Sequence, residues 1–464
     1  MDFAGSMNVV LISTYELGHQ PFGLASPAAW LRERGHRVAC ADLGLCSLPA
    51  QDVREADLVA FYLPMHTATR LAARVIGKVK ELNPAAHLCG YGLYAPLNEA
   101  YLRRLGVQTI LGGEFEAALA ELAGVLGSGE CAPQTAALIP LDRLRFLTPD
   151  RAGLPELSRY GKLRVNGERR LAGYTEASRG CKHLCRHCPI VPVYNGAFRV
   201  VQAGVVLEDV RRQVAAGAAH ITFGDPDFFN GPTHAARLVE ALHNEFPEVT
   251  YDATIKIEHL LKHRDLLPLL RQTGCLFVTS AVESVDDFVL KKLDKGHTRR
   301  DFMNVAEAFR SEGLSLAPTF IPFTPWTTRH GYADLLNVLL ELDLVDNVAP
   351  VQLALRLLIP AGSRMLELPD VRELTQAFDE AALLYRWRHA DPEIDDLAAS
   401  IFRLVDERQK EGASRRQIFQ QIWEHAAREP LPADFTVRSR APLPQLEEAW
   451  YCCAEPTEDQ LARV

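Results

Sequence analysis

Ala177-Ser-Arg-Gly-Cys-Lys-His-Leu-Cys-Arg-His-Cys-Pro189 is the stretch of this chain that decides its fold and its chemistry. It places Cys181, Cys185 and Cys188 in a C-x3-C-x2-C arrangement directly after Gly180. An iron–sulfur cluster that only carries electrons normally has four Cys ligands. Three closely spaced thiolates can hold three irons of a four-iron cluster and leave the fourth iron open. The spacing therefore predicts a cluster that binds a further ligand.

A structural zinc site is the alternative interpretation. His183 or His187 offers a fourth ligand beside the three cysteines. Zinc sites of this kind usually have a second ligand pair further along the chain, and this compact single group lacks one. The cluster interpretation is therefore favoured.

The three cysteines and the preceding Gly180 resemble the motif of radical S-adenosylmethionine (SAM) enzymes. In that family the open iron is chelated by the amino and carboxylate groups of SAM. The reduced cluster then gives one electron to the sulfonium, which breaks a C–S bond and releases a carbon radical. The family usually has an aromatic residue before the third Cys, where this chain has His187. The resemblance implies a 4Fe-4S cluster on Cys181, Cys185 and Cys188, SAM, and a reductant such as flavodoxin or ferredoxin.

Length and composition limit the other function classes. With 464 residues, 48% hydrophobic and 23% charged, the chain is typical of a soluble protein of several domains. The net charge of -9 gives no support for binding to nucleic acid or to a membrane surface. Ten cysteines in a chain of this size do not suggest a disulfide framework, and an oxygen-sensitive cluster needs a reducing compartment. We expect a cytoplasmic protein that acts on a small molecule.

Residues 7–130 alternate short apolar runs with amphipathic segments, which predicts a doubly wound, flavodoxin-like α/β domain. This part resembles the cobalamin-binding-type domain that precedes the radical domain in many such enzymes. The matching pieces are Leu31–Val38 and Gly112–Glu116. The D-x-H-x-x-G motif, whose His ligates cobalt, is absent, since Glu16–His19 is out of register. Cobalamin as a cofactor and a pure scaffold role both stay open.

Residues 131–170 are interpreted as a linker, and residues 171–365 as a partial or complete (β/α) barrel with its chemistry at the carboxyl ends of the strands. Five strands are predicted in this barrel: Ala218–Phe223, Tyr251–Glu258, Leu276–Glu283, Ala317–Pro322 and Val351–Ile359. Residues 366–445 are predicted to be helical, with helices at Asp370–His389, Asp395–Gly412 and Ser414–Arg428.

Three groups near the strand ends are candidate SAM ligands. Asp225 and Asp227 follow a strand where the family carries an acidic motif for the SAM amino group, and an Asp-Pro turn is the alternative. Glu283 and Ser284 resemble the family's Glu-Ser pair near the SAM ribose and carboxylate, and a solvated strand end is the alternative interpretation. Arg356 lies within an apolar run and needs an anionic partner: the SAM carboxylate, a substrate carboxylate or a structural acid.

The end of the chain, residues 446–464, carries Cys452 and Cys453 within Trp450-Tyr-Cys-Cys-Ala-Glu-Pro456. It resembles the tail of a radical SAM group recognised by a C-terminal CUAEP or CCAEP sequence. Adjacent cysteines are poorly placed for a disulfide with each other, but they form a compact pair of soft ligands. We interpret them as catalytic residues that bind a thiophilic ion, cap the open iron or act as a redox pair. An incidental terminus is the alternative.

These observations lead to one main hypothesis and three variants. The main hypothesis is a radical SAM enzyme that abstracts hydrogen from an unidentified substrate. The first variant transfers the 3-amino-3-carboxypropyl group of SAM to arsenite, a thiophilic metalloid held by Cys452 and Cys453, as in arsinothricin-type biosynthesis. The second is cobalamin-dependent radical methyl transfer. The third is a non-enzymatic metal or metalloid sensor with an iron–sulfur cluster.

Overall fold

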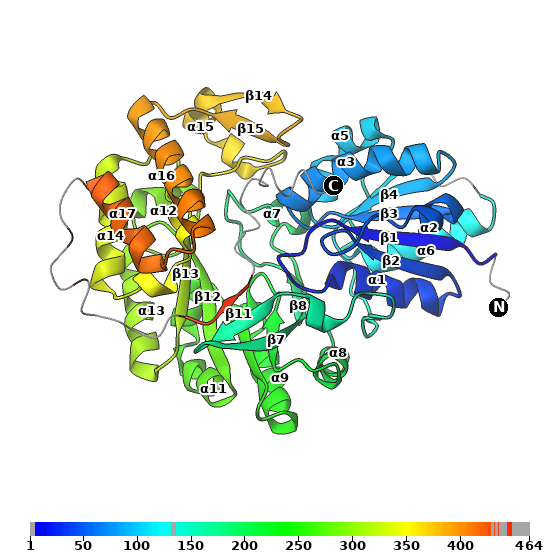
Figure 1. The fold of residues 1–464 in the computed structure, drawn as a ribbon, viewed down its shortest axis with the longest axis horizontal. Helices are drawn as coiled ribbons and strands as arrows, with labels where there is room; N and C mark the ends of the chain where they lie inside the picture. Colours follow the sequence, from blue (N-terminus) through cyan, green and yellow to red (C-terminus); the bar gives the residue numbers. More distant parts are fainter. Residues whose placement is uncertain (1–4, 131–135, 428–430, 432–434, 436–442, 448–464) are drawn as a thin grey trace.

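The computed structural model describes residues 5–130, 136–427, 431, 435 and 443–447. Two large sheets dominate this part of the chain, one in the first 130 residues and one in the middle of the chain (Figure 1). No helix among the described residues is long and apolar enough to cross a membrane.

The first sheet is parallel and has the order β2-β1-β3-β4-β5. Its strands are β1 (Asn8–Ser13), β2 (Arg37–Asp42), β3 (Leu58–Tyr62), β4 (His87–Tyr91) and β5 (Thr109–Leu111). Helices α1 (Phe22–Glu33) and α6 (Phe115–Gly127) cover one face, and α2 (Ala50–Glu55), α3 (His66–Leu82) and α5 (Glu99–Leu105) cover the other; the short α4 is Tyr94–Leu97. Because both faces of its centre are buried, the inner strands β1, β3 and β4 are mostly apolar, and the predicted doubly wound architecture is confirmed.

The second sheet is an open partial barrel with the order β13-β12-β11-β10-β7-β6-β16. Its parallel strands are β7 (Glu168–Thr175), β10 (His220–Phe223), β11 (Thr250–Thr254), β12 (Cys275–Glu283) and β13 (Leu316–Phe320). Its connecting helices are α8 (Ala203–Ala215), α9 (Pro232–Glu245), α10 (Ile257–Lys262), α11 (Leu267–Gln272), α12 (Asp287–Leu293), α13 (Arg299–Glu312) and α14 (Arg329–Glu341). The predicted α/β barrel fold is thereby confirmed in its partial form.

One edge of this barrel is extended by antiparallel strands. β6 (Lys162–Val165) forms a hairpin with β7, and β16 (Gln445–Leu446) pairs with β6. Since β16 is antiparallel to β6, the chain leaves β16 toward Lys162, whose carbonyl accepts a hydrogen bond from the Glu447 N–H. β16 therefore points toward the same edge of the sheet as the carboxyl end of β7.

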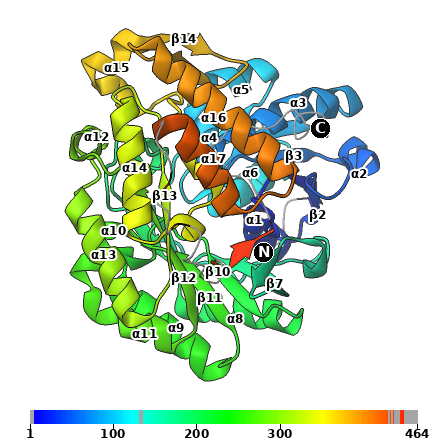
Figure 2. The same cartoon turned by 60° about the vertical axis from the view of Figure 1, so that its left-hand side comes forward.

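The C-terminal part of the described chain packs α17 (Arg415–Ala427) against α14 and α16 (Pro392–Lys410), as Figure 2 shows. The helices predicted at Asp395–Gly412 and Ser414–Arg428 are confirmed within a few residues. The helix predicted at Asp370–His389 is wrong. A short helix, α15 (Pro369–Leu374), is followed by a hairpin of β14 (Thr375–Asp379) and β15 (Leu384–Trp387). Phe378 and Tyr385 meet edge to face across this hairpin, and such cross-strand pairs stabilise a hairpin over a helix.

Two predicted barrel strands also differ from the structure. Val351–Ile359 is not a strand, because residues 350–353 form a 3-10 helix whose Leu353 carbonyl accepts a hydrogen bond from the Tyr332 hydroxyl. The strand predicted at Tyr251–Glu258 ends at Thr254, and α10 begins at Ile257. Lys256 and Glu258 therefore lie beyond the strand, at its carboxyl end.

Candidate active site

The cysteine loop begins where the small hairpin of β8 (Ser178–Gly180) and β9 (Phe198–Val200) ends. Gly180 has a φ of 71°, and a Cβ there would lie 2.5 Å from the carbonyl oxygen of Ala197 and 2.4 Å from the Tyr194 ring. Only glycine fits this left-handed, closely packed position, so it fixes the direction in which the loop leaves the hairpin. At the other side, the Arg186 N–H donates to the Leu293 carbonyl at 2.9 Å, which attaches the loop to α12.

The three predicted cluster ligands lie in this loop as free thiols. Cys185 is buried, and Cys181 and Cys188 are half-buried. Burial, together with the neighbouring Cys185 and Cys181, raises the pKa of Cys188 to about 12. Burial also raises the pKa of Cys181. Cys181 and Cys188 are therefore costly to ionise unless a cation binds them, so this donor set fits the predicted iron–sulfur cluster.

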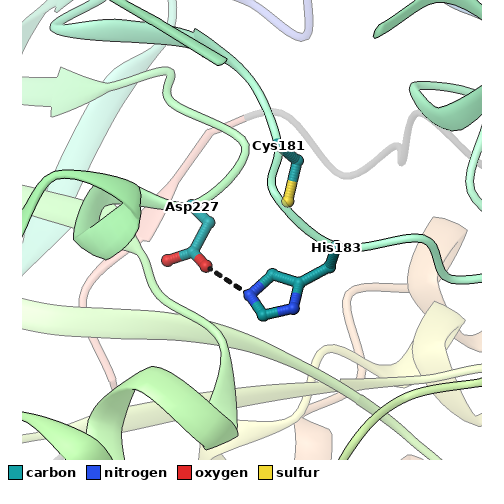
Figure 3. Close-up of side chains that lie close together, drawn as sticks. All are labelled: Cys181, His183 and Asp227. Atoms are coloured by element: carbon teal, nitrogen blue, oxygen red, sulfur yellow. Dashed lines mark ion pairs between the residues drawn. The ribbon is translucent and has the colours of Figure 1, made fainter. Parts of the chain in front are cut away.

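Asp227 lies beside the first of these thiols, at the start of the turn after β10 (Figure 3). Its Oδ2 lies 2.6 Å from Nδ1 of His259 and 3.6 Å from Nε2 of His183. Burial raises the pKa of Asp227, but the two histidines outweigh this effect and lower it to about 2. Ligand atoms of Cys181, His183 and Asp227 all lie within 4.8 Å of one another. The Asp227 carboxylate therefore stays charged next to the cysteine loop.

Asp225 has a different place. Its carboxylate accepts hydrogen bonds from the Ala177 N–H at 2.9 Å and the Ser178 hydroxyl at 2.5 Å. Burial raises the pKa of Asp225 to about 7, although these bonds oppose the shift. Both oxygens are used inside the protein, at the strand that leads into the cysteine loop. Of the predicted pair, Asp227 faces the cysteines and Asp225 supports the backbone before them.

Glu283 ends β12 and meets a histidine and a lysine. Its Oε1 lies 3.2 Å from Nε2 of His187 and 3.5 Å from Nζ of Lys295. Burial raises the pKa of Glu283, but Lys295 and His187 outweigh it and lower it to about 2. Glu283 is a non-glycine residue with a φ of 67°, next to an irregularity in the β12–β13 pairing. Backbone held in this region costs free energy and is concentrated at functional sites, so the conformation supports a functional role.

The structure also brings in residues that the sequence reasoning missed: Lys295, His259 and His187 as a partner of Glu283. Burial lowers the pKa of Lys295, but Glu283 outweighs this effect and raises it, with help from Cys185 and Cys188. Lys295 is followed by Gly296, where a Cβ would lie 2.6 Å from the Glu258 carboxylate. The available signal was the Lys-Gly pair that lies between α12 and α13, which alone does not reveal that the lysine turns inward.

Ser284 and Arg356 serve local structure among the described residues. The Ser284 hydroxyl accepts a hydrogen bond from the Asp286 N–H at 3.1 Å, at the start of α12. The Arg356 guanidinium donates to Asp395 at 2.7 Å and lies 3.6 Å from the centroid of the Trp387 ring. Of the three partners that the sequence left open for Arg356, the structure provides a structural acid.

A buried ionic group joins the two sheets just before the cysteine loop. Arg179, from β8, contacts Glu176 at 2.8 Å and two carboxylates of the first domain, Glu116 at 2.6 Å and Glu114 at 3.4 Å. Its guanidinium also lies between 5.0 and 5.6 Å from the ring centroids of Phe146, Phe115 and Phe22. Burial raises the pKa of Glu114 to about 7, against the attraction of Arg179. The first domain thus holds the residue two positions before Cys181.

Two glycines of the Gly112–Glu116 segment, which resembles part of a cobalamin-binding-type domain, are packed against this chain's own atoms. A Cβ at Gly112 would lie 2.5 Å from the Pro96 ring, and one at Gly113 would lie 2.3 Å from the Pro140 carbonyl oxygen. The Glu114 N–H donates to that same carbonyl. These glycines permit close packing of the Gly112–Glu116 loop within the protein. The predicted tail pair, Cys452 and Cys453, lies outside the described residues.

Comparison with protein families gives a match to the Radical SAM superfamily over residues 175–337. This segment includes the cysteine loop, Asp227, Glu283 and Lys295. Residues 175–337 therefore match a radical SAM domain, and a domain of this type implies a 4Fe-4S cluster and SAM.

Two curated relatives extend the comparison. The hopanoid C-3 methylase of Methylococcus capsulatus is 24% identical over 324 residues, which cover 66% of this chain and 62% of that protein. The ribosomal protein uS12 methylthiotransferase RimO of Parabacteroides distasonis is 25% identical over 228 residues, which cover 42% of this chain and 51% of that protein. The chain thus spans between half and two thirds of the length of these relatives.

Two solved structures share the fold. The cobalamin-dependent SAM radical enzyme OxsB, with aqua-cobalamin and SAM bound, gives a TM-score of 0.69 at 14% identity, covering 87% of this chain and 67% of that one. The radical SAM methyltransferase TsrM from Kitasatospora setae, with cobalamin and a [4Fe-4S] cluster, gives a TM-score of 0.57 at 16% identity, covering 73% of this chain and 70% of that one. Both likenesses concern the fold.

Proposed function

We propose that this protein reductively cleaves SAM at a 4Fe-4S cluster held by Cys181, Cys185 and Cys188, and that the resulting carbon radical acts on a small-molecule substrate. The observation that carries the proposal is the convergence of three free thiols with two buried carboxylates, Asp227 and Glu283, at the carboxyl ends of barrel strands. Ligands of parallel α/β sheets bind at this edge.

When bound, the cluster supplies an open iron and one electron for breaking a C–S bond. The chain's own residues would orient the SAM that accepts this electron. Asp227 stays ionised beside Cys181 and offers an acceptor for the SAM ammonium group. Lys295 lies near Cys185 and Cys188 and offers a cation for a carboxylate or for the cluster's own negative charge. Glu283 is paired with Lys295 and fixes the position of that cation.

Asp225 and Arg179 would act through the backbone. Asp225 holds Ala177 and Ser178, and Arg179 holds the hairpin to the first domain. Ala177, Ser178 and Arg179 lie within a few residues of Cys181, so these contacts set where the cysteine loop begins. In this proposal the first domain serves as a scaffold for the radical site, and Ser284 and Arg356 support the barrel.

The test is anaerobic reconstitution with iron and sulfide, followed by dithionite and SAM, with the products identified by mass spectrometry. We expect cleavage of SAM that depends on the three cysteines. Deoxyadenosine would indicate the usual C–S bond, and methylthioadenosine would indicate release of the 3-amino-3-carboxypropyl group. A reconstituted protein that never cleaves SAM under reduction would exclude the enzyme and favour an iron–sulfur sensor.

Methyl transfer is the second candidate, because the relatives include a hopanoid methylase and the shared fold occurs in a cobalamin-binding methyltransferase. Purification from cells supplied with cobalamin decides the matter: a retained corrinoid absorption spectrum would support cobalamin-dependent methylation, and none would leave the scaffold role.

The tail motif supports a third candidate, transfer of the carboxypropyl group to arsenite bound by Cys452 and Cys453. Trivalent arsenic binds pairs of thiols, which is the chemistry that the tail offers. Anaerobic incubation with arsenite should then give a C–As product and methylthioadenosine. The product should disappear in Cys452→Ser and Cys453→Ser, while cluster content stays unchanged.

A further inference from the structure

The barrel sheet has one apolar face and one polar face. Ile221, Tyr251, Val278 and Phe320 pack with the surrounding helices in the main hydrophobic core. Because successive strand residues point to opposite faces, the residues between them lie on the concave face of the sheet. This concave face carries His220, Thr222, Asp252, Thr254, Thr279 and Thr319. Its four threonines keep part of their surface accessible, whereas a barrel interior that only packs is filled by branched apolar side chains. The concave face therefore suits a hydrophilic molecule.

Asp252 is an acid of this face and is held at one of its two oxygens. Its Oδ1 accepts a hydrogen bond from the Thr222 hydroxyl at 2.7 Å and lies 2.8 Å from Nε2 of His220. The side chain is largely buried, since Asp252 is 7% exposed. Among the residues that the structure describes, none donates to Oδ2, and no lysine or arginine pairs with Asp252. The carboxylate is thus fixed in position while one oxygen stays available to a ligand.

The first domain adds His19 to this region, from the loop between β1 and α1. The Gly18 carbonyl accepts a hydrogen bond from the Gly161 N–H at 2.8 Å, which attaches this loop to the chain just before β6. The ring centroids of His19 and Tyr174, a residue of β7, are 4.9 Å apart. Burial lowers the pKa of His19 to about 4, against the attraction of Asp252. The imidazole is therefore neutral near pH 7, and its buried Nδ1 has no hydrogen-bond partner among the described residues.

Strand β11 connects Asp252 to the proposed SAM site. Lys256 follows this strand, and its backbone N–H donates to Oδ1 of Asp227 at 3.4 Å, beside the cysteine loop. Four steps of extended chain, at about 3.3 Å each, separate Asp252 from Lys256 by about 13 Å. This distance leaves room for a small molecule between the carboxylate and the residues that would hold SAM.

The chemistry of these groups selects a class of ligand. A largely buried carboxylate with an unused oxygen favours a hydrogen-bond donor, and its negative charge favours a donor that is a cation. An ammonium group is both. The threonine hydroxyls of the concave face and the free ring nitrogen of His19 offer hydrogen bonds to further polar groups of the same molecule.

We propose that the concave face is the substrate site of the radical enzyme, and that it takes a small hydrophilic molecule whose ammonium group binds Oδ2 of Asp252. His19 contacts the same molecule from the side of the first domain. This inference rests on the proposed function and adds a substrate class to it. It also gives the first domain a part in binding the substrate, beyond its role as a scaffold.

Equilibrium dialysis of the reconstituted full-length protein, with SAM and without a reductant, tests the proposal. The probes are 4-aminobutan-1-ol, which carries an ammonium group at neutral pH, and butane-1,4-diol, its neutral analogue; both are quantified by mass spectrometry. Asp252→Asn removes the charge and keeps an acceptor for Thr222. Asp334→Asn changes a half-buried carboxylate of α14 that pairs with Arg299, and it is the matched control. Iron content is measured in each protein as a check of folding.

We expect the wild type to bind 4-aminobutan-1-ol at least about 10-fold more tightly than butane-1,4-diol, because the hydrogen bond to Asp252 is charge-assisted. Asp252→Asn should reduce this preference to about 2-fold or less, and the control should keep it. His19→Ala should weaken binding of the amine by about 3-fold through loss of one hydrogen bond.

Three results would each overturn the ammonium site: equal binding of the two probes by the wild type, an unchanged preference in Asp252→Asn, or an equal loss in the control. The first of these decides the question even if Asp252→Asn does not fold. Full affinity in His19→Ala would overturn the part given to His19. The dialysis does not depend on catalysis, so a wild type that fails to cleave SAM with dithionite would overturn the proposed function alone.

Discussion

The two sheets of this protein present the same kind of edge and use it differently. Both end parallel strands in loops that carry carboxylates: Glu114 and Glu116 after β5, and Asp227 and Glu283 after β10 and β12. The first pair is fully buried against Arg179, within the packing of the two domains. The second pair meets histidines, Lys295 and free thiols. The same edge thus serves assembly in one sheet and, in our proposal, chemistry in the other.

The largest effect is expected from the cysteine loop. Cys185→Ser should remove bound iron and reduce SAM cleavage by about 10³-fold or more, since a metal site loses its function with a ligand. Iron content and product formation are measured together. Cys46→Ser changes an exposed thiol of the first domain and should keep both. A Cys185→Ser protein that retains full iron and activity would contradict the ligand assignment.

The second prediction concerns the charged pair at the end of β12. Glu283→Gln should lower SAM cleavage by about 10²-fold, the usual size for loss of one preorganised electrostatic contact. The iron content should stay near that of the wild type. Glu245→Gln, a half-exposed partner of Arg211 on α9, is the control and should have no effect. If Glu283→Gln cleaves SAM normally, the residue has only a structural role.

The third prediction tests the buried ionic group around Arg179, which joins the first domain to the hairpin before the cysteine loop. Arg179→Met leaves buried carboxylates without their cation and should reduce the free energy of unfolding by about 3–5 kcal/mol. Arg32→Met breaks a half-exposed pair with Asp150 and should cost no more than about 1 kcal/mol. Denaturant unfolding measures both. Equal losses in the two variants would show that the buried group has no special part in joining the domains.

The smallest effect is a dependence on pH. The pKa of Glu114 is raised from its ordinary value near 4.5 to about 7, so folding favours the protonated carboxyl. Its contribution to stability is therefore fully present below pH 4.5 and is lost as the pH rises through 7. Glu114→Gln should remove this part of the decline. Thermal unfolding of both proteins between pH 5 and 8 measures the difference, and parallel curves would refute it.

Much of this architecture could be predicted from local patterns. The strand Ala218–Phe223 and the helix Asp395–Gly412 follow from an apolar run and from helical periodicity, and the cysteine spacing indicated the radical SAM match. The polar partners could not be predicted. Lys295 and Glu283 are 12 residues apart, and Asp227 and His259 are 32 apart, so only the folded barrel brings each pair together. Arg356 was a candidate SAM ligand in the sequence, but the structure pairs it with Asp395, which lies on α16 outside the barrel strands.

The pairing of β16 with β6 sets the radius within which the end of the chain can work. Cys452 is the sixth residue after Leu446, and an extended chain spans at most about 3.5 Å per residue. The length of chain therefore allows at most about 21 Å between Leu446 and Cys452. Thiol chemistry of the pair must take place within about that distance of β16. Variants with a progressively shorter segment before Trp450 would therefore measure how far the pair must reach to the radical site.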